Sequence, residues 1–116
     1  MASERRVRKL AGTLREEVAA ILEREIEFPD GALVTVTRIA VSPDARYAAA
    51  YLTVFGGKEK EILEILKKNV YHIQQLVNRR LRMRPVPKIR FAIDEEEIRR
   101  EGIEKSLAEL KRKKEL

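Results

Sequence analysis

Two stretches of the chain repeat apolar residues at spacings of three and four, the pattern of amphipathic helices. They cover residues 7–26 and residues 62–81. Ser3 stands where the first helix needs an N-cap. The Phe-Pro-Asp-Gly run at 28–31 stops that helix, because proline cannot continue it and glycine tolerates a turn. The middle of the second stretch, residues 68–72, is poor in strong helix formers, so we expect a kink or a break there.

Three other stretches are rich in β-branched residues or alternate between apolar and polar positions, as strands do. They cover residues 33–42, 46–55 and 89–93. The first two are joined by a short turn at 42–45 and therefore predict a hairpin. The alternation changes phase within the first strand, and a β-bulge at 37–38 would reconcile its two halves.

These elements follow the order α-β-β-α-kink-α-β, and one further helix is predicted after Asp94. Three strands with helices on one face make a two-layer α+β domain. We assign residues 1–94 to this domain and residues 95–116 to a C-terminal helix with a basic tail. The length of 116 residues suits one domain of this kind.

The composition excludes several kinds of chemistry. The chain has no cysteine and one histidine, which excludes disulfides, a cysteine nucleophile and a multi-histidine metal site. His72 lies within a predicted helix and has no serine beside it, which argues against a serine hydrolase. We interpret the acidic run at 94–97 as a helix start, which the helix dipole favours, rather than as a metal site. We therefore expect no catalytic residue, no metal and no cofactor.

The sequence also gives no sign of a membrane protein. No apolar run approaches the roughly 20 residues that a membrane-spanning helix needs. Charged residues stand near the N-terminus, where a signal peptide needs an apolar stretch. We expect a cytoplasmic protein that has no membrane partner.

The positive charge is concentrated in one part of the chain. Residues 1–57 carry 8 basic and 8 acidic side chains, whereas residues 58–116 carry 17 basic and 11 acidic ones. No acidic residue lies between Glu64 and Asp94, and the window 67–90 alone carries +8. A patch of this kind attracts a nucleic-acid backbone. A solvated basic surface without a partner is the other interpretation.

Basic residues on both sides of the expected helix break describe a clamp for phosphates. A second helix that starts at the break would present backbone N–H groups to an anion, and arginine binds phosphate oxygens bidentately. This is the logic of the KH domain, in which a loop between two helices grips single-stranded nucleic acid. Tyr71 either stacks on a base there or packs against the first helix. Aromatic residues make up only 5% of the chain, which argues against a stacking platform on the sheet, and we assign Tyr47 and Tyr51 to the core or the sheet face.

Two motifs resemble a known family. Residues 41–54 contain S-x-D-x-x-x-A-x-x-Y-hydrophobic-[ST]-hydrophobic, and in residues 81–94 an L-R pair is followed by P-x-[IL]-x-F-x-x-D. In this order and spacing they resemble ribosome-binding factor A, a family of bacterial assembly factors for the small ribosomal subunit. The resemblance runs from about Arg5 to Asp94 and implies a KH-like (type II) domain with an A-x-G kink instead of the G-x-x-G loop. Here Asn69-Val70-Tyr71 stands at the kink, so we expect a milder one.

The resemblance implies a function for the whole domain. It implies a non-enzymatic factor that binds the immature small ribosomal subunit and its ribosomal RNA, near the 5′-terminal helix, and assists rRNA processing and subunit maturation. It also implies release with the help of an assembly GTPase. We expect the chain to act as a monomer. From charge position and the expected kink we predict an RNA-contact set of Lys67, Lys68, Asn69, Tyr71, Arg79, Arg80, Arg82, Arg84 and Lys88.

Two alternatives stay open. A general KH-like single-stranded RNA-binding protein would bind isolated oligonucleotides and subunits with similar affinity. A protein-interaction module would instead dock the basic strip on an acidic partner and would not bind ribosomal RNA.

Overall fold

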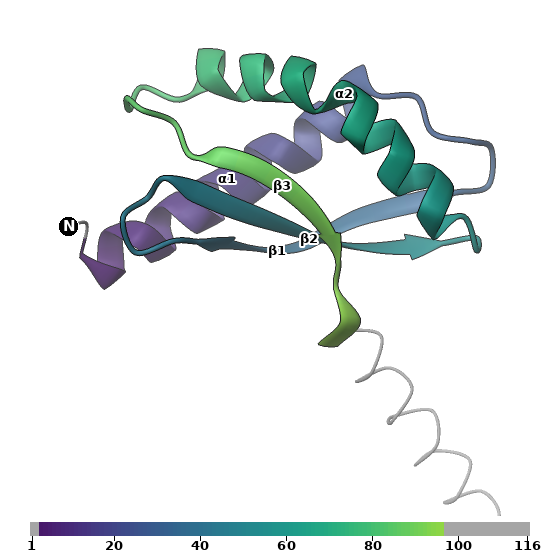
Figure 1. Cartoon of the computed structure of the whole chain (residues 1–116), viewed down its shortest axis with the longest axis horizontal. Helices are drawn as coiled ribbons and strands as arrows, with labels where there is room; N and C mark the ends of the chain where they lie inside the picture. Colours follow the sequence, from purple (N-terminus) through teal and green to yellow (C-terminus); the bar gives the residue numbers. More distant parts are fainter. Residues whose placement is uncertain (1–2, 97–116) are drawn as a thin grey trace, which may run out of the picture.

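The computed structural model describes residues 3–96. Its elements are α1 (Glu4–Glu25), β1 (Leu33–Val41), β2 (Tyr47–Phe55), α2 (Glu59–Arg80) and β3 (Lys88–Ile93). Figure 1 shows both helices on one face of a three-stranded sheet, so the predicted two-layer α+β fold is confirmed. The predicted C-terminal helix and basic tail fall on residues 97–116, which lie outside the described residues, and the domain division at residue 94 stays a prediction.

The first helix begins and ends where the sequence predicts. Ser3 is its N-cap, and the serine hydroxyl oxygen accepts a hydrogen bond from the backbone N–H of Arg6 at 3.2 Å. This bond satisfies one of the amides that the first helical turn leaves without a partner. The apolar stripe of α1 lies against the sheet, where Leu14, Val18 and Ile21 are fully buried.

The sheet has the order β1-β2-β3, with β1 antiparallel and β3 parallel to the central strand β2. The register of β1 shifts between Val36 and Arg38, which confirms the predicted bulge. At the bulge the Thr37 hydroxyl donates to Asp94 Oδ2 at 2.6 Å and lies 3.2 Å from the carbonyl oxygen of Tyr51. Asp94 Oδ2 also accepts from Arg38 Nε at 3.3 Å. The buried Asp94 carboxylate therefore ties the end of β3 to the bulge in β1.

The turn between β1 and β2 is built by the serine and aspartate of the hairpin motif. The Ser42 hydroxyl donates to Asp44 Oδ1 at 2.6 Å, and the backbone N–H of Arg46 donates to the same oxygen at 3.1 Å. These two bonds stabilise the carboxylate and hold the pKa of Asp44 below its usual value. Ala45 closes the turn with a φ of 58°. The motif thus has a local structural role in the hairpin.

The second helix bends where the sequence predicts a kink or a break. Residues 59–80 form one α-helix, so α2 is not broken into two helices. Figure 1 shows the axis of α2 changing direction near its middle, which is a bend without a break. Near there the side-chain amide of Asn69 donates to the carbonyl oxygen of Ile65 at 2.8 Å, and side-chain bonds of this type to the preceding turn often accompany bends. Because residues 67–72 lie inside the helix, they offer no second helix N-terminus to an anion.

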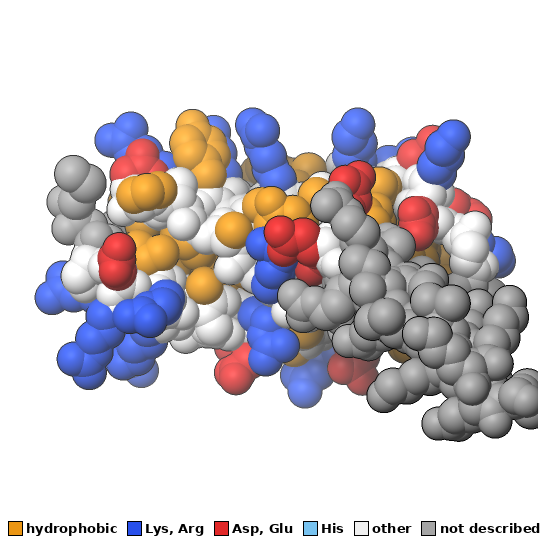
Figure 2. All heavy atoms as spheres, turned by 90° about the horizontal axis from the view of Figure 1, so that it is seen from below, with side chains coloured by type: hydrophobic (Ala, Val, Ile, Leu, Met, Phe, Trp, Pro, Cys, Tyr) orange, Lys and Arg blue, Asp and Glu red, His pale blue; other side chains and the backbone are white. Residues whose placement is uncertain are grey.

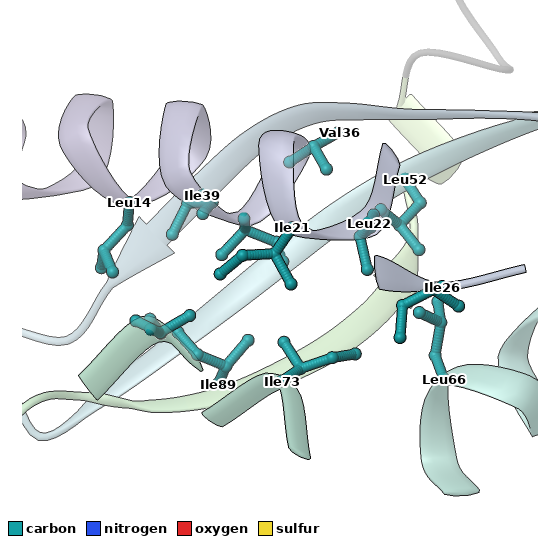
Figure 3. Packing of buried hydrophobic residues seen from close by; sticks show 14 of the residues in the cluster. Leu14, Ile21, Leu22, Ile26, Val36, Ile39, Leu52, Leu66, Ile73 and Ile89 are labelled. Carbon is teal, nitrogen blue, oxygen red and sulfur yellow. The ribbon is translucent and has the colours of Figure 1, made fainter. Parts of the chain in front are cut away.

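The core lies between the helices and the sheet. Figure 3 shows side chains from both helices and all three strands meeting there, among them Leu14, Ile21, Leu22, Ile26, Val36, Ile39, Leu52, Leu66, Ile73 and Ile89. On the central strand the small residues Ala48 and Ala50 also face the helices and are buried, which leaves room for the larger helical side chains. The alternate residues of β2, from Tyr47 to Phe55, face away from the helices, which places Tyr47 and Tyr51 on the sheet face.

We expect Gly56→Ala to destabilise the fold by more than about 1 kcal/mol. Gly56 has a φ of +108°, which L side chains rarely adopt, and an added Cβ would lie 2.7 Å from the carbonyl oxygen of Gly31. Gly12 is the matched control, because it lies in α1 and an added Cβ there meets nothing within 4 Å. Gly12→Ala should stabilise the fold by about 0.5–1 kcal/mol. Urea denaturation followed by circular dichroism measures both free energies of unfolding, and effects of the same sign would contradict this account.

Candidate nucleic-acid interface

The exposed side of α2 carries four residues of the predicted contact set. The side of the helix that faces the core is marked by the buried residues Ile62, Leu66, Ile73 and Val77. At about 3.6 residues per turn, Lys68 and Tyr71 fall most nearly opposite that side, while Lys67 and Arg79 lie to either side of them. All four side chains are exposed. Tyr71 is 76% exposed, so packing of its ring against α1 is wrong.

A groove runs between α2 and the edge strand β3. It has a volume of about 490 Å³ and is lined mainly by apolar side chains, among them Leu63, Val70 and Phe91. Its charged lining consists of Lys67 from the predicted set, Glu64, and β3 at Arg90. Arg90 belongs to the basic window of the sequence but not to the predicted set, and the alternation along β3 points its side chain away from α2. The groove places a lysine and a glutamate of α2 beside an apolar floor.

Gln74 of α2 binds the backbone at the start of β3. The side-chain carbonyl of Gln74 accepts from the backbone N–H of Ile89 at 2.9 Å, and its amide nitrogen donates to the carbonyl oxygen of Pro87 at 3.1 Å. Both bonds join α2 to the start of β3. They therefore fix the segment that carries Arg82 and Arg84 relative to the helix.

Two arginines of the predicted set are engaged within the molecule. Arg80 Nη1 lies 3.1 Å from Glu17 Oε2, an ion pair that joins α2 to α1. Arg84 Nη1 donates to the carbonyl oxygens of Leu81 at 2.8 Å and Met83 at 2.7 Å. The amide of Asn69 is likewise used inside α2. RNA contacts by these side chains would compete with the bonds that they make here.

The remaining basic residues of the set form no ion pair among residues 3–96, and all of them are exposed: Lys67, Lys68, Arg79, Arg82 and Lys88. One of them lies apart from the others. Ile89 is buried beneath the helices, so the alternation along β3 places Lys88 on the opposite face of the sheet. The structure thus gathers most of the predicted set along α2 and its exit but puts Lys88 on a different surface.

A second group of cations lies at the same end of the molecule. Figure 1 shows the start of α1, the β1–β2 turn and the segment after α2 at one end of the long axis. The start of α1 contributes the exposed residues Arg5, Arg6, Arg8 and Lys9. The charge of the N-terminal half as a whole did not reveal them, because acidic residues elsewhere in that half balance these cations. The signal was present within α1 itself, where basic residues precede Gly12 and acidic residues dominate after Arg15.

Exposed lysines and arginines beside an apolar groove can hold phosphate groups by charge while an apolar ring surface lies against the groove. No group of three His, Cys, Asp or Glu side chains that could hold a metal ion occurs in the part of the chain that the structure describes. Neither α1 nor α2 could cross a membrane, since neither is long and apolar enough. The exposed lysines and arginines of α2 and its exit make this surface suited to binding a polyanion.

Comparison with known proteins assigns the family. A family model described as ribosome-binding factor A matches residues 6–107. The ribosome-binding factor A of Thermomicrobium roseum is 36% identical over 88 residues, which cover 74% of this chain and 68% of that protein. The chain belongs to the ribosome-binding factor A family. The ribosome-binding factor A of Nitrosococcus oceani is 35% identical over 92 residues, which cover 78% of this chain and 72% of that protein.

Structures described as ribosome-binding factor A, or as a putative member, share the fold. The crystal structure of the Thermus thermophilus protein has a TM-score of 0.66 at 24% identity and covers 75% of this chain and 93% of that one. The solution structure of a Thermotoga maritima protein has a TM-score of 0.65 at 28% identity and covers 79% and 90%. A homology model of Thermus thermophilus ribosome-binding factor A, fitted into the cryo-EM map of a 30S complex, has a TM-score of 0.63 at 26% identity and covers 71% and 88%.

Proposed function

We propose that this protein is a non-enzymatic assembly factor that binds the immature small ribosomal subunit and its ribosomal RNA. The observation that carries the proposal is the family match across residues 6–107. A relative of the same fold has been fitted into the map of a 30S complex. The role in rRNA processing and the approach to the 5′-terminal helix come from the family resemblance. Because ribosomal subunits assemble in the cytoplasm, we propose that the protein is cytoplasmic. We also propose that it binds the subunit as a monomer.

The proposed contact surface is the set of nine residues that the sequence singled out. Lys67, Lys68, Arg79 and Arg82 are exposed cations without ion pairs among the described residues, so they can bind phosphates directly. Tyr71 offers an exposed ring beside them. Asn69, Arg80 and Arg84 would exchange their present partners for RNA, and Lys88 would contact it from the sheet side. The groove between α2 and β3 supports this placement because Lys67 lines it.

Sedimentation tests the function. We expect the tagged protein to travel with free small subunits on a density gradient, more with immature than with mature ones, and to be released as salt rises, since phosphate contacts are salt-dependent. A competing single-stranded RNA oligonucleotide should not displace it at equal concentration. Displacement at equal concentration would favour a general single-stranded RNA-binding protein. Absence of both the subunit and its RNA from the protein fractions would contradict the proposal and favour an acidic protein partner.

A further inference from the structure

The sheet face that points away from the helices carries features that the α2 surface does not explain. We propose that it is a second contact surface, for single-stranded RNA, whose bases stack on the central strand β2. This inference rests on the proposed function, because it adds a second RNA surface to the same assembly factor. Figure 2 shows this side of the molecule, where apolar side chains lie between lysine and arginine side chains, with some acidic side chains among them.

Aromatic side chains are concentrated on this face. Alternation along β2 places Tyr47, Tyr51 and Phe55 on it, which are three of the six aromatic residues of the chain. Tyr47 is 49% exposed and Phe55 is 77% exposed. Every nucleobase has a flat face that stacks on such rings, so a row of them binds single strands with little sequence preference. The low aromatic content argued against this platform, but the fold brings half of these rings to one strand face.

Arg38 is fixed above the middle of this row. Its guanidinium carbon lies 3.9 Å from the centroid of the Tyr51 ring. Arg38 Nε donates to the buried Asp94 carboxylate at 3.3 Å, and Thr37 holds the same carboxylate at 2.6 Å. The Arg38 side chain is still 45% exposed, and Glu96 pairs with it at 3.7 Å. The β-bulge thus presents a planar cation, already stacked on a tyrosine, whose other face a base can cover.

Between Tyr47 and Tyr51 the surface is formed by small residues. Ala49 lies between the two tyrosines on the same face, and its partner across β1 is Ala40. Its partner across β3 is Arg90. Two adjacent alanines leave space for a flat ring between the tyrosines, with a guanidinium at its edge. Lysine, glutamate or a β-branched residue at these positions would fill that space.

The charge of this face suits a polyanion. The strand positions that point away from the helices include Arg38, Lys88 and Arg90 and no carboxylate. Lys88 pairs in register with Tyr47 on the neighbouring strand, so a cation stands beside the most accessible tyrosine of the row. Neither Lys88 nor Arg90 has an ion pair among residues 3–96. Rings with unpaired cations beside them are the combination that single-strand binding surfaces use.

Tyrosine fluorescence distinguishes this surface from α2, because the chain has three tyrosines and no tryptophan. In a Tyr71→Phe protein the emission comes only from Tyr47 and Tyr51, both on the sheet face. In a protein with Tyr47→Phe and Tyr51→Phe it comes only from Tyr71 on α2, while the phenylalanines still stack. The probe is a uridine-rich single strand of about eight nucleotides. We expect the Tyr71→Phe protein to be quenched on saturation. If RNA binds, as measured by anisotropy of a labelled strand, and this protein is not quenched, the proposal is overturned.

Affinities for the small subunit give the second measurement. Tyr47→Ala with Arg90→Ala should weaken binding about tenfold, as the loss of one stacked base and one phosphate contact implies. The control is Thr13→Ala with Arg24→Ala, which changes two exposed residues of α1, also removes one positive charge, and should have no effect. If Lys67→Glu with Lys68→Glu abolishes binding but Tyr47→Ala with Arg90→Ala does not weaken it, this proposal fails and the proposed function stands. Loss of subunit binding by the Tyr47 and Arg90 variant with unchanged RNA affinity would show a protein contact instead, which also overturns it.

Discussion

The variant with Lys67, Lys68 and Arg79 replaced by glutamate should bind small ribosomal subunits about 100-fold more weakly at physiological salt. All three side chains are exposed and have no ion pair among the described residues, so their charges are available to phosphates. Reversal removes three attractive contacts and adds three repulsive ones. The dependence of the logarithm of the association constant on the logarithm of salt concentration should become less steep by about 3, one for each lost phosphate contact. A titration of labelled subunits at several salt concentrations measures both quantities.

The matched control reverses three exposed cations of α1, Arg8, Arg15 and Arg24. Both triple variants take the formal net charge from +6 to zero, so they differ only in where the charge is lost. The control should keep most of its affinity. Equal loss in the two variants would mean that the net charge of the molecule, and not the α2 surface, drives binding.

The arginines at the end of α2 are a poorer choice for this test, although they are the densest basic cluster in the sequence. Arg80 pairs with Glu17 of α1, and Arg84 binds two backbone carbonyls. Glutamate at either position would place a carboxylate beside Glu17 or beside carbonyl oxygens. A loss of binding would then combine a lost RNA contact with a disturbed fold.

Leu52→Ala should lower the free energy of unfolding by about 3–5 kcal/mol. Leu52 lies on the central strand, is fully buried, and belongs to the cluster in which both helices meet the sheet (Figure 3). Removing its side chain leaves a cavity bounded by two strands and two helices, none of which can close it without losing other contacts. Because small domains have only about 5–15 kcal/mol of stability, this is a large fraction of the total. Urea denaturation at neutral pH, with an unchanged dependence on urea concentration, measures the loss.

Leu33→Ala makes the same chemical change on the neighbouring strand. Leu33 is 63% exposed, so its loss should change the free energy of unfolding by no more than about 0.5 kcal/mol. A similar loss from both substitutions would mean that the described core does not account for the stability of the domain.

The element order could be predicted from the sequence because it depends on local patterns. The cap at Ser3, the phase change that marks the bulge at 37–38 and the alternation in β3 are all set by neighbours in the chain. The interruption of α2 was predicted for the same reason, but a local pattern cannot decide between a kink and a break. Helix propensity is a weak local preference, and the buried stripe from Ile62 to Val77 keeps α2 in one piece against the sheet. The bend in α2 is what remains of the predicted interruption.

By itself the sequence determined the two-layer fold, the family and the basic character of the segment that includes α2. Each of these depends on composition or on spacing along the chain. Only the tertiary structure decided which cations share a surface, because contacts between distant segments follow from packing. It paired Arg80 with Glu17, placed Lys88 on the far side of the sheet and brought the cations of α1 to the end of the molecule where α2 ends. It also placed the Arg38 guanidinium over the Tyr51 ring, where the Asp94 carboxylate accepts a hydrogen bond from it. No local pattern in the sequence connects these three residues.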